Sequence, residues 1–488
     1  MIRPTATACA AALAGSGTLA VLLATGALDP GRPVWLWVLG ASLALAIFLT
    51  LAEARRRTSW LAVAVSPLSL AALTWVSLFV LRPIELHLNQ RHATTGLAQF
   101  GFQLSDLTQT AALGAIGCVC CAGAYLLGLG FPQRFAGEEA KLSIARRRAV
   151  MLLVVGTALW LVLFLRAGGF HAFLSSPVSI RAHERSSFYA FIGVWLVQGT
   201  ALVAFLAFLA RRTRAAGMLL AAGIGLSALA AVGLQVRSLF AYAALAGVGL
   251  YFSLRPMRGR RLASVAAVGI AGILLLALAQ QVRGYTHFVS TREAIRRTAK
   301  TPFLSLFDND LGTFDNFVAI NKLVPGSVPY LDGRTLVEIP LSLIPRGLWH
   351  DKPLGVDTEA AAYLYPGTPA GAPLSMQGEL YWNGGILPIV LGSAVVGLLL
   401  GLFARFYVRS TPGSRLAVVY FALWPFTYAL LTRSLAVMTE NVVFALAGVV
   451  VVLLVVAPPP DLRAEVSARL RSRRPRASSA MDIKRQES

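Results

Sequence analysis

Runs of about twenty apolar residues recur along this chain from Thr5 to Ala457, and this feature limits its fold more than any other. A bilayer core about 30 Å thick needs about 20 mostly apolar residues for one helical crossing. In lipid the backbone polar groups must be bonded internally, which a helix achieves within one segment. The sequence therefore predicts an all-α integral membrane protein and excludes a soluble enzyme with a single membrane anchor.

Twelve of these runs can be placed as transmembrane helices. Hydrophobic residues make up 56% of the chain and charged residues 14%, against roughly 45–50% and ~25% in soluble domains. The predicted spans are 5–27, 34–54, 60–81, 108–130, 149–166, 188–210, 215–236, 238–254, 263–282, 384–407, 416–432 and 441–457. They divide the chain into a nine-span region (1–282), a long outer loop (283–383), a three-span region (384–457) and a basic tail (458–488).

The formal net charge of +22 comes largely from short basic clusters between the spans. Lys and Arg concentrate in the cytoplasmic loops of membrane proteins, so these clusters indicate topology, and no nucleic-acid partner is expected. The clusters lie at 55–57, 146–148, 211–214 and 255–261. Their alternation predicts an inner-membrane protein with both termini in the cytoplasm. The first span is interpreted as an uncleaved signal anchor, and the basic tail is expected to be attracted to anionic membrane lipids.

The outer loop 283–383 is the most unusual segment. It holds 10 of the chain's 22 carboxylates, and all six histidines fall on the outer side of the predicted topology. Loops of this length usually carry function. We therefore expect any chemistry to take place at the outer face.

Two short motifs stand out in this loop. Ile-Pro-Arg-Gly-Leu-Trp-His-Asp-Lys-Pro occupies 344–353, and Gln-Gly-Glu-Leu-Tyr-Trp-Asn-Gly-Gly occupies 377–385. The prolines of the first motif indicate a rigid, non-helical turn. A carboxylate beside aromatic residues at a helix entrance suits proton abstraction or sugar binding, although Trp and Tyr also concentrate at membrane interfaces for structural reasons. The residues alone leave both readings open.

Together the two motifs resemble the bacterial oligosaccharide repeat-unit polymerases, the O-antigen polymerase (Wzy-type) family. The close resemblance covers residues 338–388, and Gly384 departs from it where an aromatic residue is expected. It implies an architecture compatible with a GT-C-like membrane fold. It also implies transfer of a glycan from an undecaprenyl-diphosphate carrier to a hydroxyl of another lipid-linked repeat unit, without a metal or other cofactor. A chain-length regulator would be a further partner.

This reaction expels a diphosphate, and arginine pairs bidentately with phosphate oxygens while keeping its charge. Several arginines lie at outer span ends or in outer loops, against the positive-inside trend. The candidates for substrate binding are Arg237, Arg283, Arg346, Arg433 and, for the acceptor sugar, Arg181. Each also has a structural reading, because an arginine at a span end often extends to the lipid head groups.

The reaction must also deprotonate the acceptor hydroxyl. A catalytic base near pH 7 is a carboxylate with a raised pKa or a histidine with an ordinary one. Glu379 is the first choice, followed by Asp351, His350 and His287.

Two other classes of protein stay open on the sequence. The first is an O-antigen-ligase-like enzyme or another polyprenyl-linked glycosyltransferase, because a ligase shares this architecture and differs mainly in its acceptor. The second is a secondary transporter, which typically shows repeated halves. The two halves of this chain have no evident similarity, and the long loop between the ninth and tenth predicted spans breaks such symmetry.

Overall fold

The computed structural model describes most of the predicted spans and much of the long loop after residue 311. The described residues are 4–131, 145–166, 169, 188–233, 237–254, 293, 296, 299, 312–344, 348–349, 352–353, 355–366, 371–409 and 414–456. Every regular element in these ranges is helical, which confirms the predicted all-α class. Within the described residues, ten helical segments are long and apolar enough to cross a membrane, as expected for a multi-pass protein.

The candidate spans follow the predicted order. They are α1 (Pro4–Ala24), α2 (Pro33–Arg57), α4 (Pro67–Val76) with η1 (Ser77–Leu81) and α5 (Arg82–Leu88), α7 (Leu104–Gly130), α8 (Arg146–Arg166), α11 (Phe188–Arg211), α12 (Arg214–Gly233), α21 (Ile386–Arg409), α22 (Arg415–Leu423) with α23 (Phe426–Thr432), and α24 (Leu435–Val456). The predicted span 238–254 corresponds to α13 (Arg237–Leu254), whose apolar stretch is shorter. The predicted span 263–282 lies outside the described residues.

The boundaries of the predicted third span are wrong. Residues 60–64 form a separate short helix, α3 (Trp60–Ala64), and the candidate span runs from Pro67 to Leu88. The break arises because the Ser66 hydroxyl accepts a hydrogen bond from the Ser69 N–H and Pro67 occupies the first helical turn, an arrangement that starts a new helix. As a consequence Arg82, which the prediction placed just beyond a span, lies inside this helical segment.

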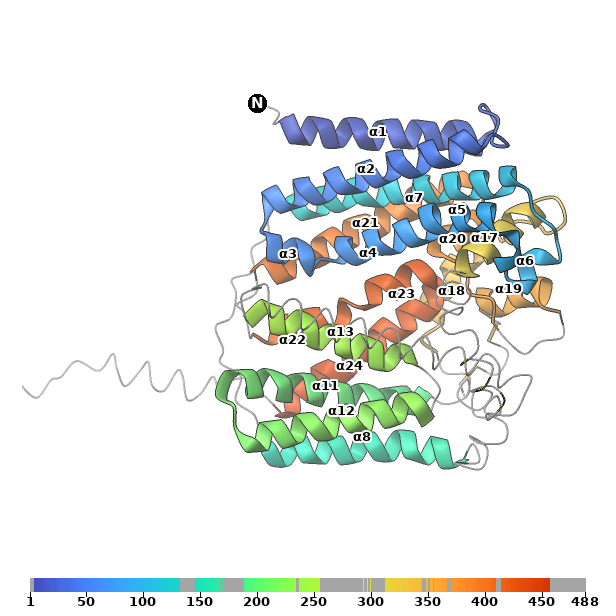
Figure 1. Ribbon diagram of the computed structural model, residues 1–488. Coiled ribbons are helices and arrows are strands. Elements are labelled where there is room, and N and C mark those ends of the chain that lie inside the picture. Colours follow the sequence, from blue (N-terminus) through green and yellow to red (C-terminus); the bar gives the residue numbers. More distant parts are fainter. Residues whose placement is uncertain are drawn as a thin grey trace, which may run out of the picture.

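Consecutive spans run antiparallel through the bundle (Figure 1). One end, here called the basic end, carries the basic residues at the end of α2 and the start of α8. The Ala145 N–H donates to the Val456 carbonyl at 2.9 Å, so the end of α24 also lies there. At the opposite end lie α17 (Gly312–Leu323), α18 (Arg334–Leu341), α19 (Val356–Leu364) and α20 (Met376–Trp382), here called the helical cap.

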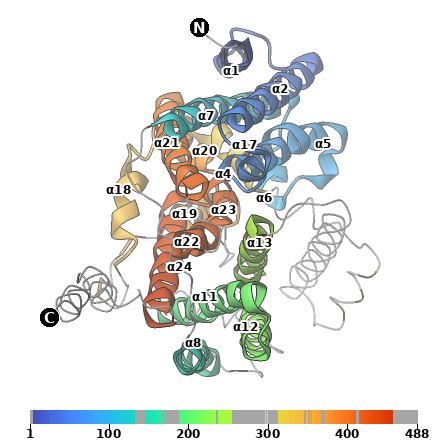
Figure 2. The same ribbon diagram turned by 90° about the vertical axis from the view of Figure 1, so that its left-hand side faces the viewer.

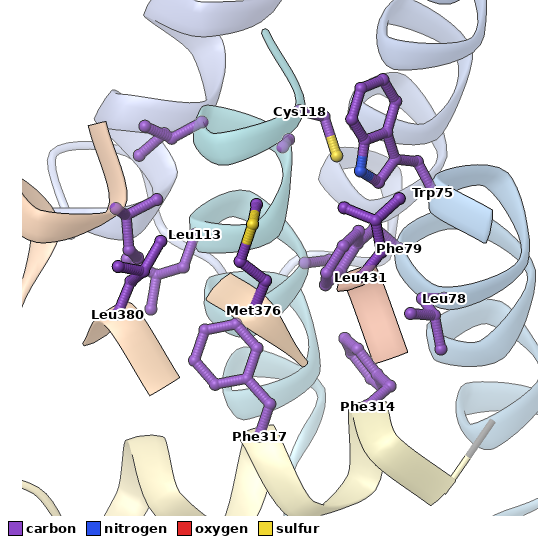
Figure 3. Packing of buried hydrophobic residues seen from close by; sticks show 14 of the residues in the cluster. Trp75, Leu78, Phe79, Leu113, Cys118, Phe314, Phe317, Met376, Leu380 and Leu431 are labelled. Atoms are coloured by element: carbon purple, nitrogen blue, oxygen red, sulfur yellow. The ribbon is translucent and has the colours of Figure 1, made fainter. Parts of the chain in front are cut away.

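The spans form two groups (Figure 2). In the first group, α1, α2, α4, α7 and α21 share one apolar core with the helical cap, whereas α8, α11, α12, α13, α22 and α24 surround a second core. The cap is embedded in the first core because its apolar side chains pack between the spans, with Phe314 facing Phe79 edge-on at 6.1 Å between ring centroids. Figure 3 shows this packing for Trp75, Leu78, Phe79, Leu113, Cys118, Phe314, Phe317, Met376, Leu380 and Leu431.

Small residues allow α7 and α21 to pack with their backbones in contact. A Cβ atom at Gly397 would overlap the Cys121 carbonyl oxygen, and one at Gly401 would overlap that of Tyr125. Helix pairs in membranes commonly use small residues spaced four apart in this way. The packing of α7 against α21 also positions α20, because α20 leads directly into the cap end of α21.

We expect the substitution Gly397→Leu to separate α7 from α21, since the closest neighbour of the new side chain is backbone that cannot rotate away. Overpacking of a tight interface usually costs about 1–3 kcal/mol and occasionally more. Thermal unfolding of the detergent-solubilised protein should show a clear loss of stability. The matched control is Gly15→Leu. A Cβ atom at Gly15 would meet open space, so this substitution should have little effect on stability.

Candidate functional site

Glu379 lies at the junction between the helical cap and α24. Its helix, α20, is capped at the N-terminus by Ser375, whose hydroxyl accepts a hydrogen bond from the Gly378 N–H at 3.0 Å. The Glu379 side chain is fully buried, and its Oε2 atom accepts a hydrogen bond from the Leu435 N–H at 2.6 Å. Leu435 is the first residue of α24, so the carboxyl occupies a helix N-terminus, where negative charge is favoured.

The surroundings of Glu379 raise the pKa of its carboxyl into the neutral range. Burial raises the pKa of this carboxyl to about 7, and the charges of Asp357 and Glu338 act in the same direction. The Leu435 N–H and the nearby Thr335 hydroxyl oppose the shift. A carboxyl with such a pKa can accept and release a proton near neutral pH, which is the property a general base requires.

Asn383 joins α20 to α18 beside this carboxyl. Its Nδ2 atom donates to the Thr335 Oγ1 atom at 2.6 Å and to the Glu379 carbonyl oxygen at 2.8 Å. The neighbouring Trp382 donates from Nε1 to the Pro329 carbonyl at 3.2 Å, which holds the end of α20 against the segment before α18. The second motif of the sequence is thus a short helix tied at both ends, and its glutamate has a defined position.

A second carboxyl of the cap lies close enough to Glu379 to affect its titration. Asp357, in the first turn of α19, keeps part of its surface exposed, yet desolvation of its carboxyl raises the pKa to about 6. The charge of Arg433, the Leu374 N–H, which lies 3.4 Å from Oδ1, and a hydrogen bond from the Ser434 hydroxyl oppose this shift. Asp357 was not predicted as a site residue, because its only signal in the sequence is its position in a carboxylate-rich loop.

Arg334 forms ion pairs on the solvent-exposed side of the cap. Its guanidinium contacts the Glu359 carboxylate and lies 3.5 Å from the Glu338 carboxylate. Burial raises the pKa of Glu338, and the charge of Arg334 opposes that shift. Arg334 and Glu359 are both partly exposed, and this pair contributes little to stability because solvent screens it.

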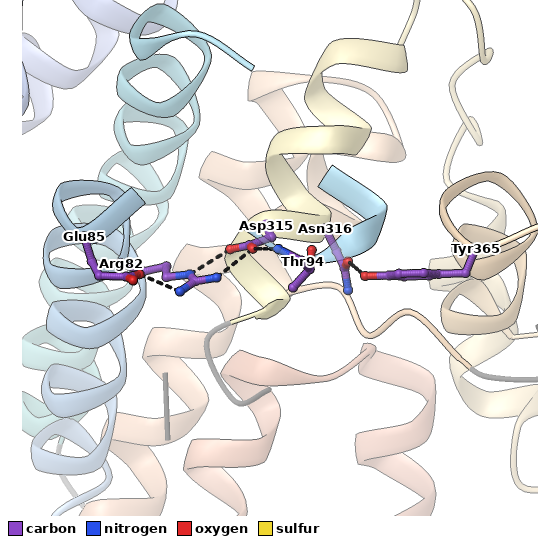
Figure 4. Close-up of polar contacts among 6 residues, drawn as sticks. All are labelled: Arg82, Glu85, Thr94, Asp315, Asn316 and Tyr365. Carbon is purple, nitrogen blue, oxygen red and sulfur yellow. Dashed lines mark hydrogen bonds and ion pairs between the residues drawn. The ribbon is translucent and has the colours of Figure 1, made fainter. Parts of the chain in front are cut away.

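A buried ion pair anchors the cap to the third span (Figure 4). Arg82 binds Asp315 of α17 through two hydrogen bonds of 2.9 and 2.7 Å, and neither side chain is exposed. The remaining Arg82 nitrogen donates to Glu85 at 2.5 Å, and the Thr94 N–H donates to Asp315 at 2.8 Å. Next to it, the Tyr365 hydroxyl donates to Asn316 at 3.0 Å and connects α19 to α17. The Arg82–Asp315 ion pair was not predicted from the sequence.

The structure describes the side chains of two of the nine sequence-predicted site residues, Glu379 and Arg433. Glu379 binds the Leu435 N–H, and Arg433 lies two residues before Leu435 in the short link between α23 and α24, where it is exposed and its charge acts on Asp357. Arg237 begins α13, but its side chain lies outside the described residues. The other six predicted site residues also lie outside them: Arg181, Arg283, His287, Arg346, His350 and Asp351.

The described arrangement offers proton transfer at Glu379 and a cationic group at Arg433. Among the residues that the structure describes, no three His, Cys, Asp or Glu side chains form a group that could hold a metal ion. Comparisons of the chain with protein-family models, curated proteins and solved structures gave no significant match.

The raised pKa of Glu379 predicts a pH-dependent stability. The unfolded chain ionises this group near pH 4.3, whereas the folded protein retains the proton up to about pH 7. The folded state therefore binds more protons in this window, and its stability falls as pH rises from about 4 to 7. The loss is on the order of 3 kcal/mol.

Thermal unfolding of the wild-type protein and the Glu379→Gln variant at pH 5 and pH 8 measures this effect. The wild-type protein should lose more stability between these values than the variant, because glutamine does not titrate and can still accept the Leu435 hydrogen bond. An equal change of stability between pH 5 and pH 8 in the two proteins would contradict the raised pKa of Glu379.

Proposed function

We propose that this chain is a glycosyltransferase of the bacterial cytoplasmic membrane that lengthens lipid-linked oligosaccharides. The donor is a glycan on undecaprenyl diphosphate, and the acceptor is a sugar hydroxyl of a second lipid-linked repeat unit. The observation that carries this proposal is Glu379: the glutamate of the polymerase-like motif is buried, has one oxygen held by Leu435, and has a pKa of about 7. Perturbed carboxyls of this kind cluster at functional sites.

In the proposed reaction the acceptor hydroxyl oxygen attacks the anomeric carbon of the donor. The new C–O bond forms as the bond between this carbon and the diphosphate oxygen breaks, and the diphosphate leaves with the electron pair. Glu379 takes the hydroxyl proton. Arginine side chains stabilise the negative charge on the departing diphosphate. Arg433 is the described arginine suited to this role, because it is exposed and two residues from the Glu379 contact at Leu435.

The proposed orientation follows from charge. The basic end faces the cytoplasm under the positive-inside rule, so the helical cap and Glu379 face outward. A reaction at that face uses a lipid-linked donor, because nucleotide sugars are cytoplasmic. Membrane lipids and a chain-length regulator complete the proposed set of partners.

The Glu379 carboxyl is enclosed in this structure, so an acceptor reaches it only when the packing around it opens. α18 is the element best suited to move. It lies at the margin of the bundle (Figure 2) and buries only Thr335. Active sites commonly close over their substrates by movement of such peripheral elements.

Deleting the gene and examining surface glycans tests the proposal. The deletion strain should carry single repeat units in place of long chains, and complementation with Arg346→Ala should leave this defect while the protein remains in the membrane. Complementation with Arg56→Ala, at the basic end, should restore long chains. Long chains in the deletion strain, whether attached to their final acceptor or accumulated unattached, would refute a polymerase; the unattached form would indicate a ligase.

A further inference from the structure

The outward face of α18 is apolar and exposed. Its members recur every three or four residues along α18 and the turn that follows, so they share one side of the helix. They are Leu336, Val337, Pro340 and Ile344. Val337, near the middle of the helix, keeps 65% of its surface exposed. Exposed apolar faces of this kind mark sites that contact a protein or a membrane.

The opposite face of α18 binds the protein through polar side chains. The Thr335 hydroxyl accepts a hydrogen bond from Asn383 at 2.6 Å and bonds to the Glu379 carboxyl. Seven residues later on the same face, the Ser342 hydroxyl donates to the Ala436 carbonyl oxygen at 3.3 Å. These contacts fix the rotation of α18 about its axis, so its apolar face points away from the cap and from α24.

The level of α18 along the spans is set by α24. This helix has 22 residues and is about 33 Å long, close to the about 30 Å of a bilayer core. Its first turn therefore lies at the membrane boundary, and the contact of Ser342 with Ala436 places α18 at that height. Figure 2, which looks along the spans, shows α18 outside them. The surroundings of its apolar face are thus the boundary between head groups and acyl chains.

We propose that α18 is an interfacial helix whose apolar face contacts the acyl chains of the outer leaflet. Amphipathic helices bury such a face about 5–10 Å into the head-group and acyl-chain boundary. Because Thr335 on its inner face bonds to Glu379, α18 separates this carboxyl from the bilayer. A lipid-linked substrate therefore enters from the leaflet at this helix. The entry route and the assignment to the outer leaflet rest on the proposed function and orientation.

Fluorescence quenching locates the helix without using catalysis. The purified Val337→Cys protein carries a fluorescent label and is placed in vesicles whose lipids bear a spin label near the start of the acyl chain. Its fluorescence should be quenched by roughly half or more of the amount at Leu391→Cys, an exposed position on the span α21. Arg91→Cys, exposed at the same end of the protein, is the aqueous control. Wild-type protein treated with the label gives the contribution of the native cysteines.

Equal quenching at Val337→Cys and Arg91→Cys would overturn the inference. The apolar face would then lie in water or under a protein partner. Neither result depends on glycan transfer, so the position of α18 is tested separately from the proposed function.

Photochemical cross-linking tests the entry route. A photoreactive group on Val337→Cys, in vesicles containing undecaprenyl-diphosphate-linked repeat units, should capture the carrier roughly 10-fold or more above its share of the vesicle lipid. Leu391→Cys on α21 should capture it in proportion to that share. If both positions capture the carrier in proportion while the wild-type protein still transfers glycan, substrate enters elsewhere and the function stands. If the wild-type protein transfers no glycan, the proposed function fails, and quenching at Val337→Cys still decides the lipid contact.

Discussion

Replacing Arg82 with alanine is expected to destabilise the protein by about 3–5 kcal/mol, because the substitution leaves the Asp315 carboxylate buried without its counter-charge. The pair is fully buried and bidentate, so water cannot compensate for the loss. The helical cap should loosen from the third span, since Asp315 is the polar contact of α17 with α5. Thermal unfolding in detergent and protein abundance in the membrane measure the effect.

The charge on Asp315, and not the loss of packing alone, should account for most of this effect. A double variant, Arg82→Leu with Asp315→Leu, should recover most of the lost stability, because apolar residues of similar volume often replace buried ion pairs at little cost. Arg91→Ala removes an exposed arginine near the same end and should leave stability almost unchanged. An Arg82→Ala protein as stable as Arg91→Ala would show that the pair does not hold the cap.

Replacing Glu379 with glutamine is expected to lower the rate of glycan transfer by roughly 10²- to 10⁴-fold, the usual contribution of a general base. Glutamine fits the same space and can still accept the Leu435 hydrogen bond, so the fold should be retained. It cannot take the proton of the acceptor hydroxyl. Transfer of glycan between lipid-linked repeat units by the purified protein, measured under single-turnover conditions, gives the rate.

The pH profile adds an independent criterion. The wild-type rate should rise with pH to a plateau above about 7, because the carboxyl must be ionised to act as base. Glu359→Gln is the matched control, since this glutamate contacts Arg334 on the outer side of the cap. It should retain near-normal transfer. Equal rates for the Glu379→Gln and Glu359→Gln variants would remove Glu379 from the mechanism.

The spans could be predicted from the sequence because each needs only a local run of apolar residues. Boundaries were wrong where polar residues continue a helix or start a new one. The last span was predicted from residue 441, but α24 begins at Leu435, so Thr439 and Glu440 belong to the helix. Hydropathy places such residues outside a span, whereas the backbone hydrogen bonds of the helix include them.

The site could be predicted only where one motif contained it. Glu379 was predicted as a site residue because it lies among aromatic residues before a span. Its partner Leu435 is 56 residues away, and Thr335 is 48 residues from Asn383. Arg82 and Asp315 are separated by 233 residues. These contacts depend on how the spans pack, and no local pattern in a single sequence predicts such long-range pairs.

Glycan transfer by the isolated protein is the decisive measurement for the proposed glycosyltransferase function. The purified chain in lipid vesicles is supplied with undecaprenyl-diphosphate-linked repeat units and no nucleotide sugar. We expect glycans of two or more repeats on the lipid carrier, one undecaprenyl diphosphate released for each new bond, and neither product with the Glu379→Gln variant. No lengthened glycan from the wild-type protein, or equal amounts from the variant, would contradict it.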